Sequence, residues 1–175
     1  NGGGAWSYNT QFTYCNIFGN NTTGSGGGVY SHYSTHIIYP QVAPTIISCC
    51  QIHGNQSGNS GGGIRMGYHN DKVLNSLVCN NTSGNAGGGI NGNGKLVNTT
   101  VVCNLSNGNG GGLAGDIDLK NCIVWGNKRY GVTDNISGNS VSCFYSAIEG
   151  GFIGEGNFIL GEANSEAENS PCFAN

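Results

Sequence analysis

Asp116 and Asp118 are the two aspartates that lie closest together in the sequence, so they are the first candidates for acid–base chemistry. Their i, i+2 spacing places both carboxylates on one face of a strand. Glycosidases use two or three carboxylates, held on adjacent strands at separations that the mechanism sets. The other aspartates, Asp71 and Asp134, do not fall at matching positions of neighbouring repeats. The pair therefore lacks a partner. We interpret it as a solvated edge beside Lys120, and we expect no catalysis.

Tyrosine and histidine suggest a binding surface instead. The stretch from Tyr30 to Pro40 makes one repeat longer than its neighbours, and it holds two of the four histidines and three of the eight tyrosines. Loops that leave a rigid scaffold often carry binding function, and tyrosine rings suit sugar rings or partner surfaces. The loop of residues 65–71 is expected beside it, one repeat away. The predicted contact patch comprises Tyr33, His36, Tyr39, Tyr68 and His69. The alternative is a hydrophobic cluster that covers one face.

Eight cysteines are spread along the chain: Cys15, Cys49, Cys50, Cys79, Cys103, Cys122, Cys143 and Cys172. Strand neighbours about 4.8 Å apart fall inside the Cα range of disulfides, about 4.4–6.8 Å, so Cys15–Cys50 and Cys79–Cys103 are possible bridges. The alternative is a stack of buried free thiols, which we favour for Cys122 and Cys143. No Cys-x-x-Cys pair occurs, and the sequence shows no ligand geometry for a metal site of His32, His36 and His69. We therefore expect neither a metal nor another cofactor.

A repeated phrase indicates how these residues are held. A glycine triplet followed by an aliphatic residue begins at Gly2, Gly26, Gly61, Gly87 and Gly110, in steps of 24, 35, 26 and 23 residues. An asparagine precedes each later triplet by six or seven residues, and Asn127 continues the series. Self-similarity at a period of 20–50 residues is typical of solenoids and related arrays.

The segments between these markers are short and rich in β-branched and aromatic residues, which is typical of strands, and no window has the apolar spacing of a helix. The sequence therefore predicts an all-β fold, a right-handed parallel β-helix of about six rungs of 23–26 residues, where a rung is one circuit of the chain. Equivalent residues should stack in columns. One column is aliphatic: Ala5, Val29, Ile64, Ile90 and Leu113. Another is an asparagine ladder: Asn20, Asn55, Asn80, Asn104 and Asn127.

The phrases Pro44-Thr-Ile-Ile-Ser-Cys-Cys-Gln-Ile-His-Gly-Asn55 and Gly61-Gly-Gly-Ile64 resemble the repeats of right-handed parallel β-helix proteins of the pectate-lyase-like superfamily. The likeness is closest to repeats of the polymorphic outer-membrane-protein type and of large bacterial surface proteins. The ending, Ser170-Pro-Cys-Phe-Ala-Asn175, is similar to the last coil of such surface domains. The resemblance implies a scaffold at the cell surface and says little about activity.

Composition narrows the possible partners. Charged residues make up 9% of the chain, the net charge is −3 and Lys plus Arg total six, which excludes a basic nucleic-acid footprint and argues against polyanion binding. No run of 18 apolar residues predicts a membrane span. Residues 1–148 are interpreted as repeats, and residues 149–175, with five Glu and no Lys or Arg, as an acidic last coil. The chain opens within a repeat phrase, so we expect a processed product or a fragment.

Eight asparagines stand in Asn-x-Ser/Thr sequons: Asn20, Asn21, Asn55, Asn80, Asn81, Asn98, Asn104 and Asn135. An amide engaged in a ladder cannot carry a glycan, so we interpret the sequons as by-products of the repeat. A eukaryotic secreted source would reopen the question for Asn21, Asn81 and Asn98. The sequence as a whole predicts a non-catalytic, extracellular β-solenoid that is structural or adhesive and stacks head-to-tail, because an open first rung invites a contact that does not close. A glycan or surface partner fits the same prediction. Two alternatives stay open: a carbohydrate-binding or polysaccharide-degrading β-helix, and a piece of a long surface protein.

Overall fold

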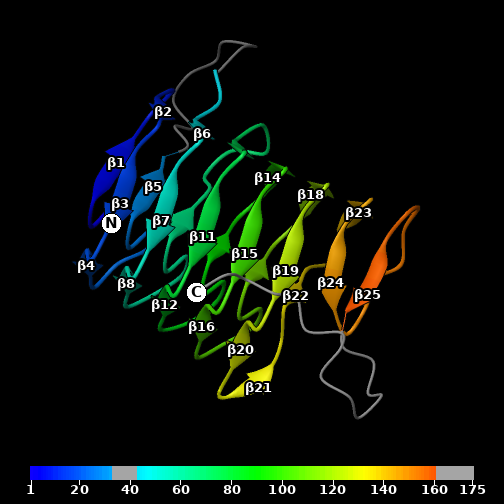
Figure 1. Ribbon diagram of the computed structural model, residues 1–175. Helices are drawn as coiled ribbons and strands as arrows, with labels where there is room; N and C mark the ends of the chain where they lie inside the picture. Colours follow the sequence, from blue (N-terminus) through cyan, green and yellow to red (C-terminus); the bar gives the residue numbers. More distant parts are fainter. Residues whose placement is uncertain (33–42, 161–175) are drawn as a thin grey trace.

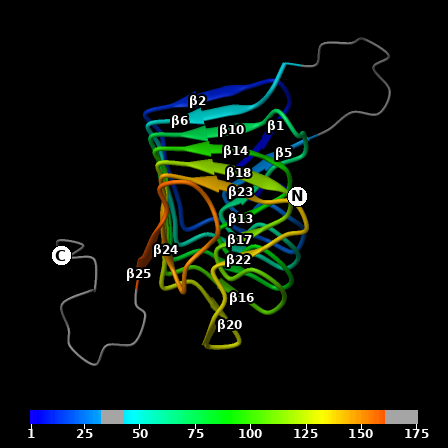
Figure 2. The ribbon, with the colours of Figure 1, turned by 90° about the vertical axis from the view of Figure 1, so that its right-hand side faces the viewer.

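The computed structural model describes residues 1–32 and 43–160, which form short strands joined by turns, with no helix. The chain winds through four sheets, A to D, in the same order on each circuit (Figure 1). Figure 2 shows the strands of sheet B stacked one above the next. The predicted all-β parallel solenoid of about six rungs is confirmed. No helix in the described ranges is long and apolar enough to cross a membrane.

Each rung contributes one strand to each sheet, with few exceptions. Sheet A contains β1 (Ala5–Ser7), β5 (Val29–Ser31), β9 (Ile64–Arg65), β13 (Ile90–Asn91), β17 (Leu113–Ala114) and β22 (Ile136–Ser137). Sheet B contains β2 (Gln11–Thr13), β6 (Ile46–Ser48), β10 (Lys72–Leu74), β14 (Gly94–Val97), β18 (Ile117–Lys120) and β23 (Ser142–Phe144).

Sheet C is the largest and contains β3 (Asn16–Phe18), β7 (Gln51–His53), β11 (Leu77–Cys79), β15 (Thr100–Val102), β19 (Ile123–Trp125), β24 (Ala147–Glu149) and β25 (Phe158–Leu160). Sheet D contains β4 (Asn21–Thr22), β8 (Gln56–Ser57), β12 (Thr82–Ser83), β16 (Leu105–Ser106), β20 (Lys128–Arg129) and β21 (Val132–Thr133). All described strand pairs are parallel except β20–β21, which is an antiparallel hairpin.

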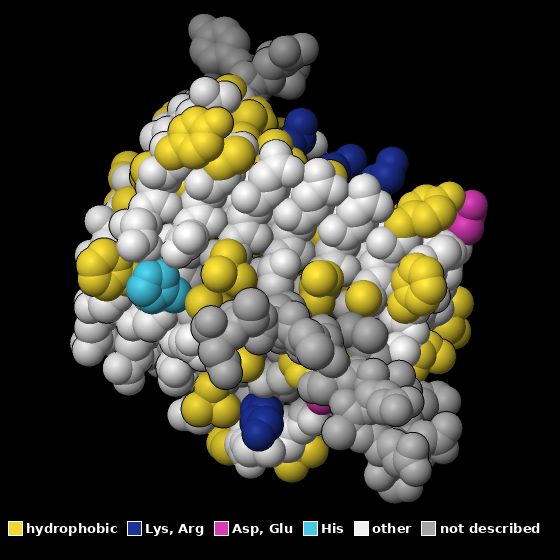
Figure 3. Space-filling view, in the orientation of Figure 1, with side chains coloured by type: hydrophobic (Ala, Val, Ile, Leu, Met, Phe, Trp, Pro, Cys, Tyr) yellow, Lys and Arg dark blue, Asp and Glu magenta, His cyan; other side chains and the backbone are white. Residues whose placement is uncertain are grey.

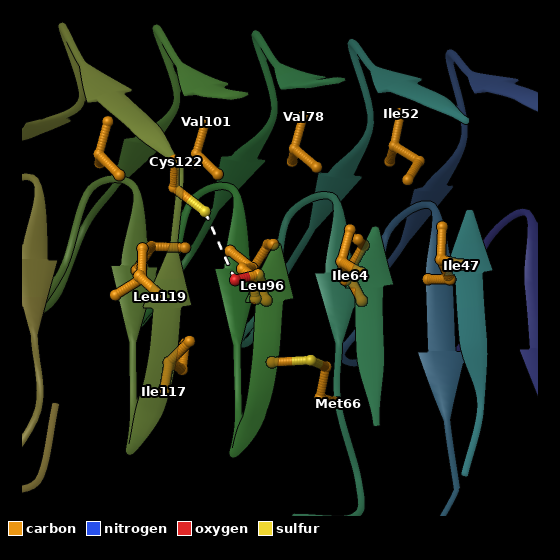
Figure 4. Packing of buried hydrophobic residues seen from close by; sticks show 14 of the residues in the cluster. Ile47, Ile52, Ile64, Met66, Val78, Leu96, Val101, Ile117, Leu119 and Cys122 are labelled. Atoms are coloured by element: carbon orange, nitrogen blue, oxygen red, sulfur yellow. Dashed lines mark hydrogen bonds between the residues drawn. The ribbon is translucent and has the colours of Figure 1, made fainter. Parts of the chain in front are cut away.

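The core is a set of aliphatic columns that run along the solenoid axis (Figure 4). The predicted column on sheet A is confirmed, because Ala5, Val29, Ile64, Ile90 and Leu113 are successive register partners. Sheets B and C add columns of their own, in which Leu96 and Val101 are fully buried. Burying a side chain of this size contributes roughly 1.5–3 kcal/mol, and here each rung provides part of the cover for the next.

The asparagine ladder exists, but its third member is Asn81 and not the predicted Asn80. The side-chain amide of each member donates to Oδ1 of the member in the next rung at 2.9–3.0 Å, through the series Asn20, Asn55, Asn81, Asn104, Asn127 and Asn135. Asn81 is fully buried, whereas Asn80 is exposed with φ +54°. Asn80 occupies the left-handed corner position that Gly54 takes one rung earlier.

A second ladder of hydroxyl and thiol groups runs along the corner between sheets B and C. The backbone N–H of Cys50 donates to Oγ of Ser76 at 3.1 Å, and the N–H of Cys122 donates to Oγ of Ser146 at 3.0 Å. Thr99 fills the same position in rung 4. Each inward group follows a residue with positive φ, such as Cys49 or Asn121, just as in the asparagine ladder. Two corners of the solenoid thus share one design, a left-handed residue followed by an inward polar side chain.

The glycine triplets allow both a left-handed turn and close contact between rungs. The first glycine of each triplet has a positive φ, for example +70° at Gly61, a conformation that glycine adopts without a Cβ penalty. The second packs directly on the backbone of the next rung: a Cβ on Gly62 would collide with the carbonyl oxygen of Gly88. Close backbone contact between rungs therefore requires glycine at these positions.

The two ends of the solenoid differ. In rung 1, strands β1 to β4 each pair with only one other described strand, and Phe12 and Ile17 are only partly buried. At the other end, β21 folds back along β20, and Glu149 accepts hydrogen bonds from the last ladder amide and from Gly126. The C-terminal end of the ladder is therefore closed, and its N-terminal end is open.

Candidate functional site

The outer face of sheet B carries half of the chain's basic residues. Lys72 of rung 3 and Lys95 of rung 4 are register partners. Lys120 of rung 5 pairs in register with Val97 of rung 4. The strands alternate, so these side chains point outward while Val73, Leu96 and Leu119 point into the core. Figure 3 shows Lys and Arg side chains in succession along the upper right margin, where Figure 1 places the strands of sheet B.

A shallow groove of about 280 Å³ lies on this face. Outward side chains of three neighbouring strands line it: two lysines on adjacent strands, one aspartate, one serine and two apolar residues. These are Lys95, Lys120, Asp118, Ser142, Val97 and Phe144. Asp118 is the single acidic side chain in the six described strands of sheet B, and its Oδ2 lies 3.8 Å from Nζ of Lys95. Both side chains are about half exposed, at 54% and 52%, so solvent screens the pair strongly.

Aromatic rings gather on the outer face of sheet A. Trp6 and Tyr30 are register partners, and His32 stacks on both, with ring centroids 5.1 Å and 6.3 Å away. Arg65 follows Tyr30 in the same column, and its guanidinium donates to the carbonyl of Met66 at 2.7 Å. The Trp6 side chain is 57% exposed, which leaves a flat aromatic surface open to solvent.

The predicted contact patch is only partly described. Tyr33, His36 and Tyr39 lie outside the described residues. Tyr68 and His69 lie in the loop between β9 and β10, with ring centroids 4.3 Å apart. Half-buried Tyr68 and exposed His69 thus form a pair, whereas a joint patch with the other three members stays a prediction.

The buried carboxylate of Asp71 shapes this loop. Its Oδ2 accepts the backbone N–H groups of Gly67 and Tyr68, both at 3.1 Å, and its Oδ1 accepts the N–H of Thr45 at 2.9 Å. Charge-assisted bonds of this kind are among the stronger ones in proteins. Asp71 therefore ties the loop of rung 3 to rung 2 and is not available to a ligand.

The Asp116–Asp118 pair is exposed, as expected for a solvated edge. Asp116 stands just before β18 and accepts the N–H of Ser140 at 3.0 Å, while Asp118 pairs with Lys95. Across the sheet, the register partners of Asp118 are Lys95 and Ser142. No second carboxylate therefore faces Asp118 from the adjacent strands.

The seven cysteines within the described ranges carry free thiols. Cys15 and Cys50 occupy one column, and the N–H of Cys15 lies 3.4 Å from Sγ of Cys50. The predicted alignment of Cys79 with Cys103 is wrong, because Cys79 pairs in register with Val102 and Cys103 follows at the corner. This error has the same origin as the choice of Asn80, a shift of one residue in rung 3.

Burial changes the chemistry of the inner thiols. Desolvation raises the pKa of Cys122 from 9.0 to about 11, with a smaller raising effect from Cys143, and hydrogen bonds to nearby backbone groups lower it. Desolvation also raises the pKa values of Cys50, Cys79 and Cys143. These four cysteines are therefore weak nucleophiles near neutral pH, and Cys50, Cys122 and Cys143 behave as small apolar core residues. No group of three or more potential metal-ligating side chains occurs among the described residues.

The lysine row on sheet B and the Trp6–Tyr30–His32 group were not predicted from the sequence. The three lysines lie 23 and 25 residues apart, close to the repeat period, and that spacing is the signal that places them on one face. Trp6 and Tyr30 likewise each follow the aliphatic residue after a glycine triplet. Comparison with protein-family models, curated proteins and solved structures finds no match to this chain.

Proposed function

We propose that this chain is a non-catalytic, extracellular β-solenoid with a structural or adhesive role. The observation that carries the proposal is that its buried asparagine side chains form a ladder that joins successive rungs, in the series from Asn20 to Asn135. The outward carboxylates Asp116 and Asp118 are engaged by a backbone N–H and by a lysine, not by each other. Such a scaffold presents regular flat faces, which suits adhesion. The extracellular location rests on the resemblance of the repeats to bacterial surface proteins.

End-to-end association is the narrower form of this proposal. Trp6 and Phe18 in rung 1 stack on His32 and His53 of rung 2, with ring centroids 5.1 Å and 5.3 Å apart. Their side chains remain 57% and 59% exposed, so a further rung would cover them. At the opposite end β21 and Glu149 obstruct sheet D and the amide ladder. A head-to-tail contact would therefore form mainly through β22 and β23, each of which pairs with only one neighbour among the described strands.

Sedimentation velocity over a range of concentrations, together with negative-stain imaging, tests this association. We expect growth with concentration in the natural chain and loss of growth in Phe18→Lys, which places a charge on the open end. Gln51→Lys is the matched control, because Gln51 is an exposed outward residue of the same sheet one rung further in. Monomers at all concentrations would rule out end-to-end association and leave the proposal of a single adhesive module.

A polysaccharide-cleaving or carbohydrate-binding protein is the second candidate, favoured by the exposed ring of Trp6 and the half-buried ring of Tyr30 beside it. Incubation with a panel of plant and algal polysaccharides, followed by measurement of reducing ends, tests for cleavage. Products that disappear in Asp116→Ala or Asp118→Ala would replace the non-catalytic proposal with an enzymatic one. Polysaccharides that remain uncleaved in this assay support a non-catalytic scaffold.

A further inference from the structure

We infer that the outer face of sheet B binds a linear anionic polysaccharide that runs along the solenoid axis. The ligand lies across rungs 3 to 6, over the row formed by Lys72, Lys95 and Lys120. This inference rests on the proposed adhesive function, since it names the class of partner to which the solenoid adheres. Composition averaged over the chain argued against polyanions, but folding places three of six basic residues on one face.

The geometry of the sheet sets the spacing of the charges. Successive rungs are separated by about 4.8 Å, so each rung from 3 to 5 adds one ammonium group at that interval along the axis. A polymer with a carboxylate on each sugar ring offers anions at a comparable interval. Globular anions and single carboxylates would contact one lysine at a time. The row therefore selects a repeating ligand.

Asp118 weakens the positive field of this face without cancelling it. It is paired with Lys95 at 3.8 Å, and both side chains are about half exposed. Exposed pairs of this kind contribute only about 0–1 kcal/mol, and a polymer carboxylate competes for the same ammonium. Lys72 and Lys120 have no acidic register partner on the neighbouring strands.

The rest of the groove fits sugar rings better than it fits a bare chain of phosphates. Val97 and Phe144 flank Lys120 in the column of register partners, and the Phe144 side chain is 43% exposed. They form an apolar platform beside the charges, and the exposed hydroxyl of Ser142 lies next to Asp118. Pyranose rings present apolar C–H faces together with hydroxyl groups, so they complement both features.

Binding of the purified chain to immobilised alginate, a linear polyuronate, tests the inference. We expect Lys72→Gln, Lys95→Gln and Lys120→Gln each to weaken binding about twofold to fivefold, the range of an exposed charge pair, and the triple variant to lose it. Higher salt should weaken binding to the natural chain, with a smaller salt dependence in each variant. Phe144→Ala should weaken binding without changing its dependence on salt.

Two variants make the test specific. Asp118→Asn removes the one negative charge in the described strands of sheet B and should tighten binding, whereas the lysine variants should weaken it. Lys128→Gln on β20 of sheet D removes an equal charge from another face and should leave binding unchanged. All changed residues are exposed or half-buried, and thermal melting of each variant confirms that it is folded.

The inference is overturned if the triple lysine variant binds alginate as the natural chain does, if Lys128→Gln weakens binding equally, or if Asp118→Asn weakens it. Equal binding to inorganic polyphosphate, with no effect of Phe144→Ala, would overturn the polysaccharide as the ligand class. Sedimentation of the same samples reports end-to-end association separately. If the chain does not bind alginate, end-to-end association can still be correct. If the chain stays monomeric, alginate binding can still be correct.

Discussion

The side-chain amide of Asn135 donates a 3.0 Å hydrogen bond to Oε2 of Glu149, and this contact ends a chain of amides that begins at Asn20. Every amide-to-amide hydrogen bond in this chain runs in the same direction, toward the C-terminal end. Aligned hydrogen bonds polarise one another, so the last donor carries extra positive character. A carboxylate is the acceptor best suited to that position.

Replacement of Glu149 should therefore destabilise the last rungs. Glu149 also accepts the backbone N–H of Gly126 at 2.8 Å, so Glu149→Ala leaves two donors without this acceptor and should cost about 2–4 kcal/mol in the free energy of unfolding. Glu149→Gln keeps one acceptor oxygen and should cost about 1–2 kcal/mol. Urea unfolding monitored by circular dichroism measures both. Glu155→Gln is the control, because Glu155 is exposed; a cost in this control equal to that of Glu149→Gln would contradict the special role of Glu149.

Asn80 and Asn81 are neighbours that should respond very differently to substitution. The Asn81 amide donates to Asn104 and to the carbonyl of Ile52, and its oxygen accepts from Asn55, so Asn81→Ala should cost about 3–5 kcal/mol. Asn80→Gly should change stability by less than about 1 kcal/mol, because Gly54 already fills the same left-handed corner one rung earlier. Denaturant unfolding of the two variants checks this contrast. A larger loss in Asn80→Gly would mean that the ladder is assigned to the wrong residue.

The sequence was sufficient to predict the solenoid because the repeat is a physical constraint as well as a pattern. Glycine is required where rungs touch, as at Gly62, and an aliphatic residue must follow each triplet to fill a narrow core. Few other residues fit these glycine and aliphatic positions, so the same residue types recur in each rung and their columns could be predicted from the sequence. The column from Ala5 to Leu113 was predicted correctly for this reason.

The ladder was misplaced in rung 3 because two asparagines stand side by side there. The four ladder members that are followed by a glycine triplet precede it by six residues, as Asn81 precedes Gly87, whereas Asn80 stands seven before it. A constant offset is the stronger criterion, since strand register cannot change by one residue without reversing every side chain. The same shift produced the wrong alignment of Cys79 with Cys103.

The surface was harder to predict than the core. Outward positions need no particular residue to maintain the fold, so the repeat pattern does not dictate which residue stands there. Lys72, Lys95 and Lys120 also fall in two adjacent columns of sheet B, which hides their relation in a linear alignment. The end of the ladder could not be foreseen, because Asn135 enters it through the short hairpin of β20 and β21 in place of a glycine triplet.

N-linked glycans should attach only to exposed sequons if the chain is expressed in a secretory pathway that adds them. Asn21, Asn80 and Asn98 are exposed, whereas the ladder asparagines from Asn55 onward are buried with their amide nitrogens engaged. This corrects the expectation for Asn81, which is fully buried. Mass spectrometry of glycosidase-treated peptides should find occupancy at Asn80 and none at Asn81. Occupancy at Asn81 would require the ladder to open, and would contradict its burial in the folded protein.

Alkaline pH should destabilise the protein through Cys122. Its thiol has a pKa of about 11 in the fold, raised by desolvation from 9.0. Below about pH 9 the thiol is protonated in both states, but between pH 9 and 11 the unfolded chain releases the proton first, so the free energy of unfolding falls by about 1–3 kcal/mol. Cys122→Ser should remove this part of the loss, because serine fits the column that already contains Ser76 and Ser146. Urea unfolding at pH 8 and pH 11 measures it, with Cys103→Ser, an exposed thiol, as control; parallel pH profiles for the natural chain and Cys122→Ser would contradict the assignment.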